Sequence, residues 1–348
     1  MRRIISRTLR VAMLLPVYFL HSDVIDILQK ITRIFGQSIY PFMPGRLHIM
    51  VKTATTGGKC QKRPFRGQWQ SPVMLTMDVR PYYHDDGFTL YHGDCIHVME
   101  QMPKGEVDLI FADPPYNLSN GGFTCQSGKR ASVNKGLWDE SHGIENDFVF
   151  HTNWIRACKR VLSEQGSIWI SGTYHSIYAC GFALQKEGFH VLNDICWFKP
   201  NASPNLSTRY FTASHETLLW AKKAGKAKHM FNYQEMKCGD WKEDSLKRPG
   251  KQMRTVWSIP TPRNSEKSQG SHPTQKPLAL LKRIILSCSR EDSLVLDPFT
   301  GSSTTGLAAC ILKRRFLGID TDTEYLDISV RRYREMRNPG RREKEEDR

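Results

Sequence analysis

The sequence lacks the residue patterns of several common protein classes. Its 348 residues contain nine cysteines, an odd number, with no C-x-x-C pair, which argues against a disulfide framework and against a zinc site. The twelve histidines form no H-E-x-x-H or similar spacing, so no metal is predicted. No internal repeat is evident. We therefore expect a reducing, cytoplasmic compartment.

The chain has few acidic residues relative to basic ones. Its formal net charge is +15, which suits a polyanionic partner. Residues 1–76 hold 12 Lys and Arg against 2 Asp, a net +10, so most of the excess lies in this leading segment.

The first 76 residues form a basic extension that carries no clear core-forming pattern. An apolar run from Val11 to Leu20 follows four arginines, but it is too short to span a bilayer and no clear cleavage site follows it. Three interpretations stay open: an upstream extension before a start at Met74 or Met77, a DNA- or partner-binding arm, and a targeting segment. We predict that the extension is disordered or dispensable, and we predict no membrane partner.

A short apolar run ends in Asp113-Pro114-Pro115-Tyr116. The run, residues 107–112, predicts a buried parallel strand, and ligands bind at the carboxyl ends of such strands. Prolines donate no backbone N–H, so the carbonyls here stay free. Asp113 and the Pro114 carbonyl can accept both N–H groups of a nucleobase amine, while Tyr116 offers a flat face to a base flipped out of a duplex. The same four residues are also typical of a rigid turn.

A strand, a turn and a helix are predicted roughly 180 residues later. Residues 293–296 predict a strand that Asp297 ends, Gly301 permits a tight turn, and residues 304–312 predict a helix. A further strand, 315–319, ends in Asp320, at the spacing where an acidic residue holds ribose hydroxyls. The single glycine disfavours a pyrophosphate loop, and hence an NAD-type oxidoreductase, and favours S-adenosylmethionine. The predicted cofactor residues of this unit are Asp297, Phe299, Gly301, Ser302, Ser303, Thr304 and Asp320.

These segments resemble a known enzyme family. Asp113-Pro-Pro-Tyr116, His272-Pro-Thr-Gln-Lys-Pro277, Asp297-Pro-Phe-Thr-Gly301 and Gly318-Ile-Asp320 are similar to the β-class of DNA amino-methyltransferases, in which the catalytic motif precedes the cofactor motif. The resemblance runs from about residue 82 to 334. It is greatest to GATC-specific adenine methyltransferases of restriction–modification systems, through residues 117–122, 135–139 and 209–212, and nearly as great to GANTC-specific enzymes. Ser303 stands where many relatives have glycine.

The resemblance implies further site residues. Asp94 would accept the adenine amine of the cofactor, and the Cys95 backbone N–H would bind its ring. Thr274 and Lys276 would bind the methionine carboxylate. A target-recognition region would occupy about residues 221–271, and three polar residues after the predicted strand 191–197 would line the flipped-base pocket: Lys199, Asn201 and Asn205.

Two segments carry basic residues that suit DNA phosphates. Residues 119–139 have little apolar periodicity and predict a long loop, which in a compact domain is usually functional. Residues 222–269 hold basic clusters interleaved with aromatic residues. Any one cluster is also typical of a solvated surface. The candidate DNA-binding residues in the two segments are Lys129, Arg130, Lys135, Lys247 and Arg248.

We therefore predict a doubly wound, mostly parallel, Rossmann-like methyltransferase sheet over residues 80–335 with a DNA-recognition insertion, followed by a charged tail at 336–348. The predicted reaction is site-specific transfer of a methyl group from S-adenosylmethionine to the N6 amine of a flipped-out adenine in DNA. The alternatives are an N4-cytosine methyltransferase, although that group usually has Ser at the position of Asp113, and a non-catalytic DNA-binding protein. The sequence leaves open a homodimer and a cognate restriction endonuclease.

Overall fold

A computed structural model of the chain describes residues 79–338 except 117–122, 127–128, 133–138, 140, 208, 240, 242–249 and 271. The chain divides into two units, residues 1–69 and 70–348, and every described residue belongs to the second. The predictions for residues 1–76 and for Lys135, Lys247 and Arg248 therefore lie outside the described residues. The side chains of Lys129 and Arg130 lie outside them too.

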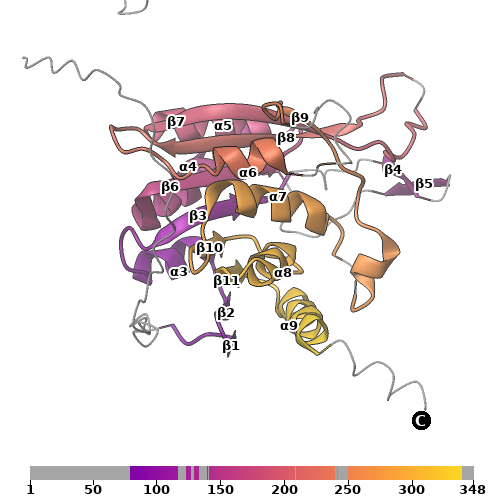
Figure 1. Cartoon of the computed structure of the whole chain (residues 1–348). Coiled ribbons are helices and arrows are strands. Elements are labelled where there is room, and N and C mark those ends of the chain that lie inside the picture. The colour runs from indigo at the N-terminus through magenta and orange to yellow at the C-terminus, as the bar shows by residue number, and fades with distance from the viewer. Residues whose placement is uncertain are drawn as a thin grey trace, which may run out of the picture. The chain divides into compact units, whose positions relative to one another are not determined.

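The described part of the chain contains a nine-stranded sheet with the order β1-β2-β11-β10-β3-β6-β8-β7-β9 (Figure 1). The run β2-β11-β10-β3-β6 is parallel, while β8 runs antiparallel to both β6 and β7. The sheet is thus mostly parallel, as predicted. The strands are β1 (Tyr83–Asp85), β2 (Phe88–His92), β3 (Val107–Ala112), β6 (Leu162–Gly172), β7 (Phe189–Phe198), β8 (His215–Lys223), β9 (Val256–Ser258), β10 (Leu294–Asp297) and β11 (Arg315–Asp320).

The chain changes direction across the sheet between β10 and β3. From β10 it passes through a helix to β11 on one side, and from β3 it passes through a helix to β6 on the other. In open parallel sheets the ligand site forms at such a switch point, beyond the carboxyl ends of the two strands. Since β10 ends in Asp297 and β3 precedes Asp113, the two predicted motifs meet there.

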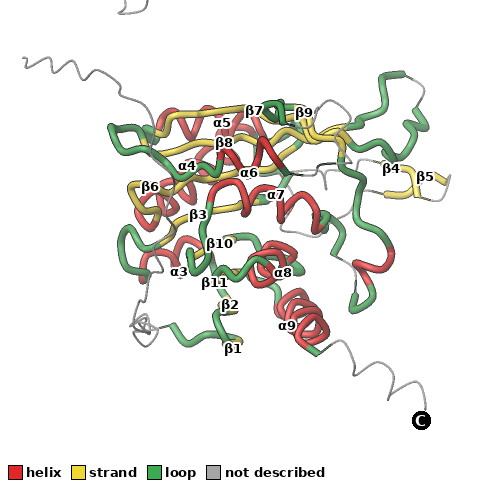
Figure 2. The backbone as a smooth tube through the Cα atoms, in the orientation of Figure 1, coloured by secondary structure: helices red, strands yellow, loops and turns green. Residues whose placement is uncertain are grey.

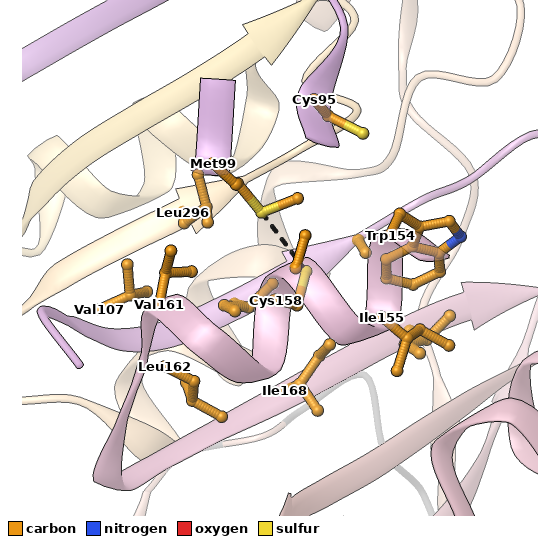
Figure 3. Close-up of a cluster of buried hydrophobic side chains, with 14 of the residues drawn as sticks. Cys95, Met99, Val107, Trp154, Ile155, Cys158, Val161, Leu162, Ile168 and Leu296 are labelled. Atoms are coloured by element: carbon orange, nitrogen blue, oxygen red, sulfur yellow. Dashed lines mark hydrogen bonds between the residues drawn. The ribbon is translucent and has the colours of Figure 1, made fainter. Parts of the chain in front are cut away.

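Helices cover both faces of the sheet (Figure 2). One face packs against α3 (Cys95–Gln101), α4 (Ile144–Val161) and α5 (Ile177–Lys186), through a core in which Met99, Trp154 and Cys158 are fully buried (Figure 3). The other face packs against α7 (Leu278–Cys288), α8 (Thr304–Ile311) and α9 (Thr323–Arg337). The short helix α6 (Tyr233–Cys238) precedes α7. The predicted doubly wound fold is confirmed.

The predicted boundaries differ from the observed ones by a few residues at most. The strand 107–112 is as predicted, and the helix starting at Thr304 ends at Ile311 instead of Leu312. The prediction of one long loop over 119–139 is wrong, because β4 (Phe123–Gln126) and β5 (Lys129–Ser132) pair there as an antiparallel hairpin. None of the described helices is long and apolar enough to cross a membrane.

Candidate active site

The Asp113-to-Tyr116 segment leaves the end of β3, and polar contacts fix it on several sides. The Tyr116 hydroxyl donates to Asp113 Oδ1 at 2.5 Å, and the Tyr116 backbone N–H donates to Asp139 Oδ1 at 2.7 Å. Tyr116 is 5% exposed. The contact with Asp139 joins the motif to the far end of the 119–139 segment. The sequence predicted the motif and missed this anchor.

Lys276 reaches Asp113 from the segment that precedes α7. Its Nζ donates to Asp113 Oδ2 and lies 3.7 Å from Glu216 Oε2. Burial raises the pKa of Asp113, the Lys276 charge lowers it, Glu216 raises it, and the net direction is upward. The pKa of Lys276 is also raised, since Asp113 and Glu216 outweigh the effect of burial. The structure thus brings together a predicted catalytic residue and a predicted cofactor residue 163 positions apart.

Glu216, at the start of β8, is a functional candidate that the sequence analysis did not assign. Its Oε2 lies 3.0 Å from Tyr116 Oη and accepts from Ser171 Oγ at 3.1 Å, and its Oε1 accepts from Lys199 Nζ at 2.5 Å. Burial alone would raise the pKa of Glu216, but Lys276 and Lys199 lower it to about 2. A buried carboxylate whose charge two lysines stabilise therefore lies beside the predicted catalytic motif. The available signal was a lone acid in a run that otherwise predicts a buried strand.

The turn after β10 is tied together by Asp297, which is 2% exposed. Its Oδ2 accepts from Thr305 Oγ1 at 2.5 Å and its Oδ1 accepts from the Phe299 N–H at 3.1 Å. Burial raises the pKa of Asp297 to about 7. The ring of Phe299 packs edge-on against Trp154, with centroids 5.3 Å apart. The Asp297 carboxylate and the Phe299 ring therefore both hold the turn, which follows β10 beside the predicted catalytic motif.

Gly301 and Ser303 both adopt left-handed backbone conformations, with φ of +50° and +53°. This conformation costs a residue with a side chain about 1–2 kcal/mol, which explains why glycine suits either position. Ser303 is fully buried, and its hydroxyl lies 2.9 Å from Thr300 Oγ1, a contact glycine would not make. The departure at Ser303 therefore keeps the turn and adds a polar contact within it.

Asp320 lies at the end of β11, next to the turn. Its Oδ2 accepts from the Gly301 N–H at 2.8 Å and its Oδ1 accepts from the Asp322 N–H at 2.9 Å. The Gly93 N–H donates to the Asp320 carbonyl at 2.9 Å, which brings the Asp94 loop alongside. Burial raises the pKa of Asp320. The predicted ribose-binding acid thus lies between two other predicted cofactor segments.

Asp94 and Cys95 begin helix α3. The exposed Asp94 caps the helix, since its side chain accepts from the His97 N–H at 3.0 Å. The Cys95 thiol is buried, and burial raises its pKa to about 12. Only the exposed carboxylate and the backbone of this pair are therefore available to a ligand.

The 272–277 segment packs on the cofactor turn. The His272 ring lies 4.2 Å from that of Tyr325 in α9, and Ser302 Oγ donates to Gln275 Oε1 at 3.3 Å. Arg332 of α9 donates to the Ser302 carbonyl and, at 3.0 Å, to Thr304 Oγ1. Thr274 is half-buried, and its carbonyl accepts from Lys276. The segment and the turn therefore form one unit that α9 supports.

Three predicted DNA-binding residues make contacts within the protein. Lys199 forms an ion pair with Glu216. The Asn201 amide donates to Thr261 Oγ1 at 2.9 Å. The Asn205 amide donates to the Tyr210 carbonyl at 2.6 Å. These residues shape the segment 199–214 between β7 and β8, which projects from the same end of the sheet as the β4–β5 hairpin (Figure 1). The segment that carries all three therefore lies at the end of the sheet that also carries the β4–β5 hairpin (Figure 1).

A separate cavity of about 280 Å³ lies against β7, β8 and α6. It shares no lining residue with the cluster around Asp113, and four of its ten lining residues are aromatic. The aromatic lining residues are Trp220, His229, Phe231 and Tyr233.

Known proteins are similar to this chain over most of its length. The profile of a family described as DNA methylase (N6_N4_Mtase) matches residues 107–331. The chain is 45% identical over 264 residues to the Type II methyltransferase M2.MboI of Moraxella bovis, across 75% of this chain and 93% of that protein. It is 48% identical over 262 residues to M2.DpnII of Streptococcus pneumoniae, with the same coverage.

Solved structures agree with the fold. The M1.HpyAVI–SAM complex is 29% identical, with a TM-score of 0.52 over 71% of this chain and 98% of that one. PvuII DNA methyltransferase, described as cytosine-N4-specific, is 18% identical, with a TM-score of 0.58 over 74% of this chain and 90% of that one, which supports the fold alone. By the length of the family match and the identity to its relatives, this chain belongs to the N6_N4 family of DNA methylases.

Proposed function

We propose that Asp113, Pro114, Pro115 and Tyr116 carry out methyl transfer to the N6 amine of an adenine flipped out of DNA. The protein is an adenine-specific DNA methyltransferase of the β-class, and S-adenosylmethionine is its cofactor. The sequence-based predictions of class, reaction, DNA as substrate and cofactor are confirmed. The roles of individual residues are our proposal.

The observation that supports these roles is the meeting of three segments at the switch point of the sheet. β10 and β3 are paired neighbours, with Val295 opposite Leu109, so that Asp297 and Asp113 emerge side by side. Lys276 arrives from the third segment and bonds Asp113. A nucleoside cofactor held at the β10 turn would therefore present its reactive end to the Asp113 motif.

The residues of the turn fit S-adenosylmethionine. Asp320 has two carboxylate oxygens that each accept one backbone N–H, which leaves lone pairs for ribose hydroxyls. Asp94 offers an exposed carboxylate to an amine, and Lys276 with Thr274 offers donors to a carboxylate. Phe299, Gly301, Ser302, Ser303 and Thr304 would line the same site. When bound, S-adenosylmethionine supplies an electrophilic methyl group on sulfur.

The protein's own contribution to the reaction is to orient and activate the nitrogen. Asp113 and the Pro114 carbonyl each accept one N–H of the target amine, which favours a pyramidal nitrogen with a localised lone pair. That lone pair forms the new N–C bond as the S–C bond breaks, and the sulfur retains the bonding electrons. The nitrogen then loses one proton, and the buried Asp113 carboxylate, whose pKa is raised, is placed to receive it. Tyr116 supports the face of the base.

DNA binding is assigned to the end of the sheet that carries the motif. Lys199, Asn201 and Asn205 would shape the flipped-base pocket through the segment 199–214, and basic residues of the hairpin and of the region 221–271 would contact phosphates. The recognition sequence that the resemblance favours is GATC, with GANTC as the alternative. We further propose a cytoplasmic enzyme, since cofactor and DNA meet there. A homodimer and a cognate restriction endonuclease are its proposed partners.

The test is methylation of DNA with methyl-labelled S-adenosylmethionine, followed by digestion to nucleosides and mass analysis. Duplexes containing GATC, GANTC or neither site, each also supplied as single strands, separate the sequence preference from the strand preference. We expect N6-methyladenine in GATC. Formation of N4-methylcytosine would refute the adenine assignment, and label in the site-free duplex would refute the site assignment.

The catalytic assignment has a separate test. Asp113→Ala should abolish methyl transfer while the dissociation constant of S-adenosylmethionine stays within about threefold, because the lost interaction belongs to the transition state. Tyr116→Ala should also weaken binding of the target duplex, since stacking contributes about 1–3 kcal/mol per base. Single-turnover transfer and calorimetric cofactor binding are measured for both variants. Robust N6-methyladenine formation by Asp113→Ala would remove Asp113 from the reaction.

A further inference from the structure

Two protein donors already occupy the Asp113 carboxylate. The Tyr116 hydroxyl donates to one oxygen at 2.5 Å and the Lys276 ammonium donates to the other. A carboxylate has lone pairs for further donors, but a short hydroxyl bond and an ammonium both draw negative charge away from it. Asp113 becomes a strong acceptor for the target amine only if the hydroxyl and the ammonium shift their hydrogen bonds to another acceptor.

Glu216 is a second acceptor within reach of both donors. Its Oε2 lies 3.0 Å from the Tyr116 hydroxyl and 3.7 Å from Lys276 Nζ, and its Oε1 is held by Lys199 at 2.5 Å. The Ser171 hydroxyl donates to the same Oε2 at 3.1 Å. The side chain of Glu216 is 9% exposed, so water offers little competition for these contacts.

Resting on the proposed function, we propose that Glu216 is a positioning residue that takes over the Tyr116 hydroxyl and the Lys276 ammonium when the target amine engages Asp113. A rotation of the tyrosine hydroxyl and a small shift of the lysine head group are sufficient, because both acceptors already surround them. Glu216 acts through Asp113 and does not touch the base. Lys199 fixes its outer oxygen and keeps the inner one aimed at the motif.

The charges in the cluster support this exchange. Asp113 and Glu216 face Lys276 and Lys199, so two carboxylates are balanced by two ammonium groups, with Tyr116 between the carboxylates. The Glu216 charge raises the pKa of Asp113 and so strengthens it as an acceptor, while Lys276 opposes this. Glu216 itself stays ionised, because its pKa is lowered to about 2. A neutral residue at 216 would therefore lower the pKa of Asp113.

The experiment uses the full chain with Glu216→Gln, which keeps the shape of the side chain and removes its charge. Single-turnover methyl transfer to the duplex should slow by about tenfold or more, while the dissociation constant of S-adenosylmethionine changes less than about threefold. The matched control is Glu164→Gln. Glu164 forms an ion pair with Lys223 on the surface, and its variant should keep the full rate. A full rate for Glu216→Gln would overturn the inference.

The pH profile distinguishes positioning from general support of the fold. The acid limb of the single-turnover rate reports protonation of Asp113, whose neighbouring charged groups are Lys276, Glu216 and Asp297. In Glu216→Gln this limb should move to lower pH, because the charge that raised the pKa of Asp113 is gone. A variant that only loosens the fold would lose rate without this shift. An acid limb at the wild-type position would contradict the proposal.

A second variant tests the exchange directly. Tyr116→Phe removes the hydroxyl that competes for Asp113, so adding it to Glu216→Gln should speed methyl transfer by about threefold or more relative to Glu216→Gln alone. A double variant that is no faster would refute the exchange. If the wild-type protein forms no N6-methyladenine, the proposed function fails as a whole, whereas normal wild-type product with no effect of Glu216→Gln removes this inference alone.

Discussion

Replacement of Asp320 should weaken cofactor binding without affecting DNA binding. A hydrogen bond between a ribose hydroxyl and a carboxylate contributes about 1.5–3 kcal/mol. Asp320→Ala should therefore weaken S-adenosylmethionine binding by roughly 10- to 150-fold. Binding of duplex DNA should be unchanged, because the carboxylate lies in the proposed cofactor turn, where it accepts from the backbone N–H groups of Gly301 and Asp322.

The structure also predicts how Asp320→Ala affects stability. The variant loses two backbone hydrogen bonds, each contributing about 1 kcal/mol. It is also relieved of a largely buried carboxylate, whose pKa burial raises. These effects oppose each other, so we expect a small change in unfolding temperature, and the loss of affinity can be attributed to the lost contact with the cofactor.

Titration calorimetry with S-adenosylmethionine measures the effect. The control is Asp322→Asn, which removes a neighbouring charge while asparagine keeps the cap that Asp322 provides to the Glu324 N–H. We expect its affinity to match the wild type. An unchanged dissociation constant in Asp320→Ala, or equal weakening in Asp322→Asn, would refute the assignment of Asp320 to the ribose.

Three further predictions follow from the same geometry. Gly301→Ala should lower the free energy of unfolding by about 1–2 kcal/mol and weaken cofactor binding, because φ is +50° and a Cβ would lie 3.1 Å from His272 Nε2; unchanged values by urea unfolding and calorimetry would contradict this. Burial raises the pKa of Asp297 from 3.8 to about 7, so the wild type should lose stability relative to Asp297→Asn as the pH rises through this interval; parallel unfolding free energies from pH 5 to 8 would show otherwise. A chain starting at Met77 should fold and methylate DNA, and insolubility or a loss of specific activity beyond about tenfold, or ~1.4 kcal/mol, would assign a function to residues 1–76.

The parts of the fold that the sequence predicted are those encoded locally. Residues 107–112 form the predicted strand and residues 304–311 the predicted helix, because a local apolar pattern needs no distant partner to be recognised. The hairpin in 119–139 was missed because its two four-residue strands are short and polar. The Ser127-Gly128 pair between them is a turn signal that would have supported it.

The sequence predicted those site residues that stand in a motif with a recognisable chemical role. Asp113 and Asp320 each end a recognisable strand, and their positions follow from the rule that ligands bind at the carboxyl edge. Glu216 does not follow the end of a predicted strand, and its local signal is only that of a lone acid in a mostly apolar run. Its partners Ser171 and Lys199 come from two other strand ends, and nothing in the local sequence at 216 indicates that they converge. The sequence also gave no indication that Lys276 would bond Asp113.

The order of the two motifs along the chain has little bearing on the geometry of the site. Catalysis requires the β3 and β10 ends to be neighbours, and the parallel pairing of Val295 with Leu109 provides this although 186 residues separate them. A chain that carried the cofactor unit first could build the same pair of strand ends with different connections. The order does determine which segments cross the site: the 272–277 segment precedes the cofactor unit, so Lys276 enters above the switch point and contacts Asp113. In this arrangement one lysine lies beside the proposed catalytic carboxylate and is also the proposed partner of the cofactor carboxylate.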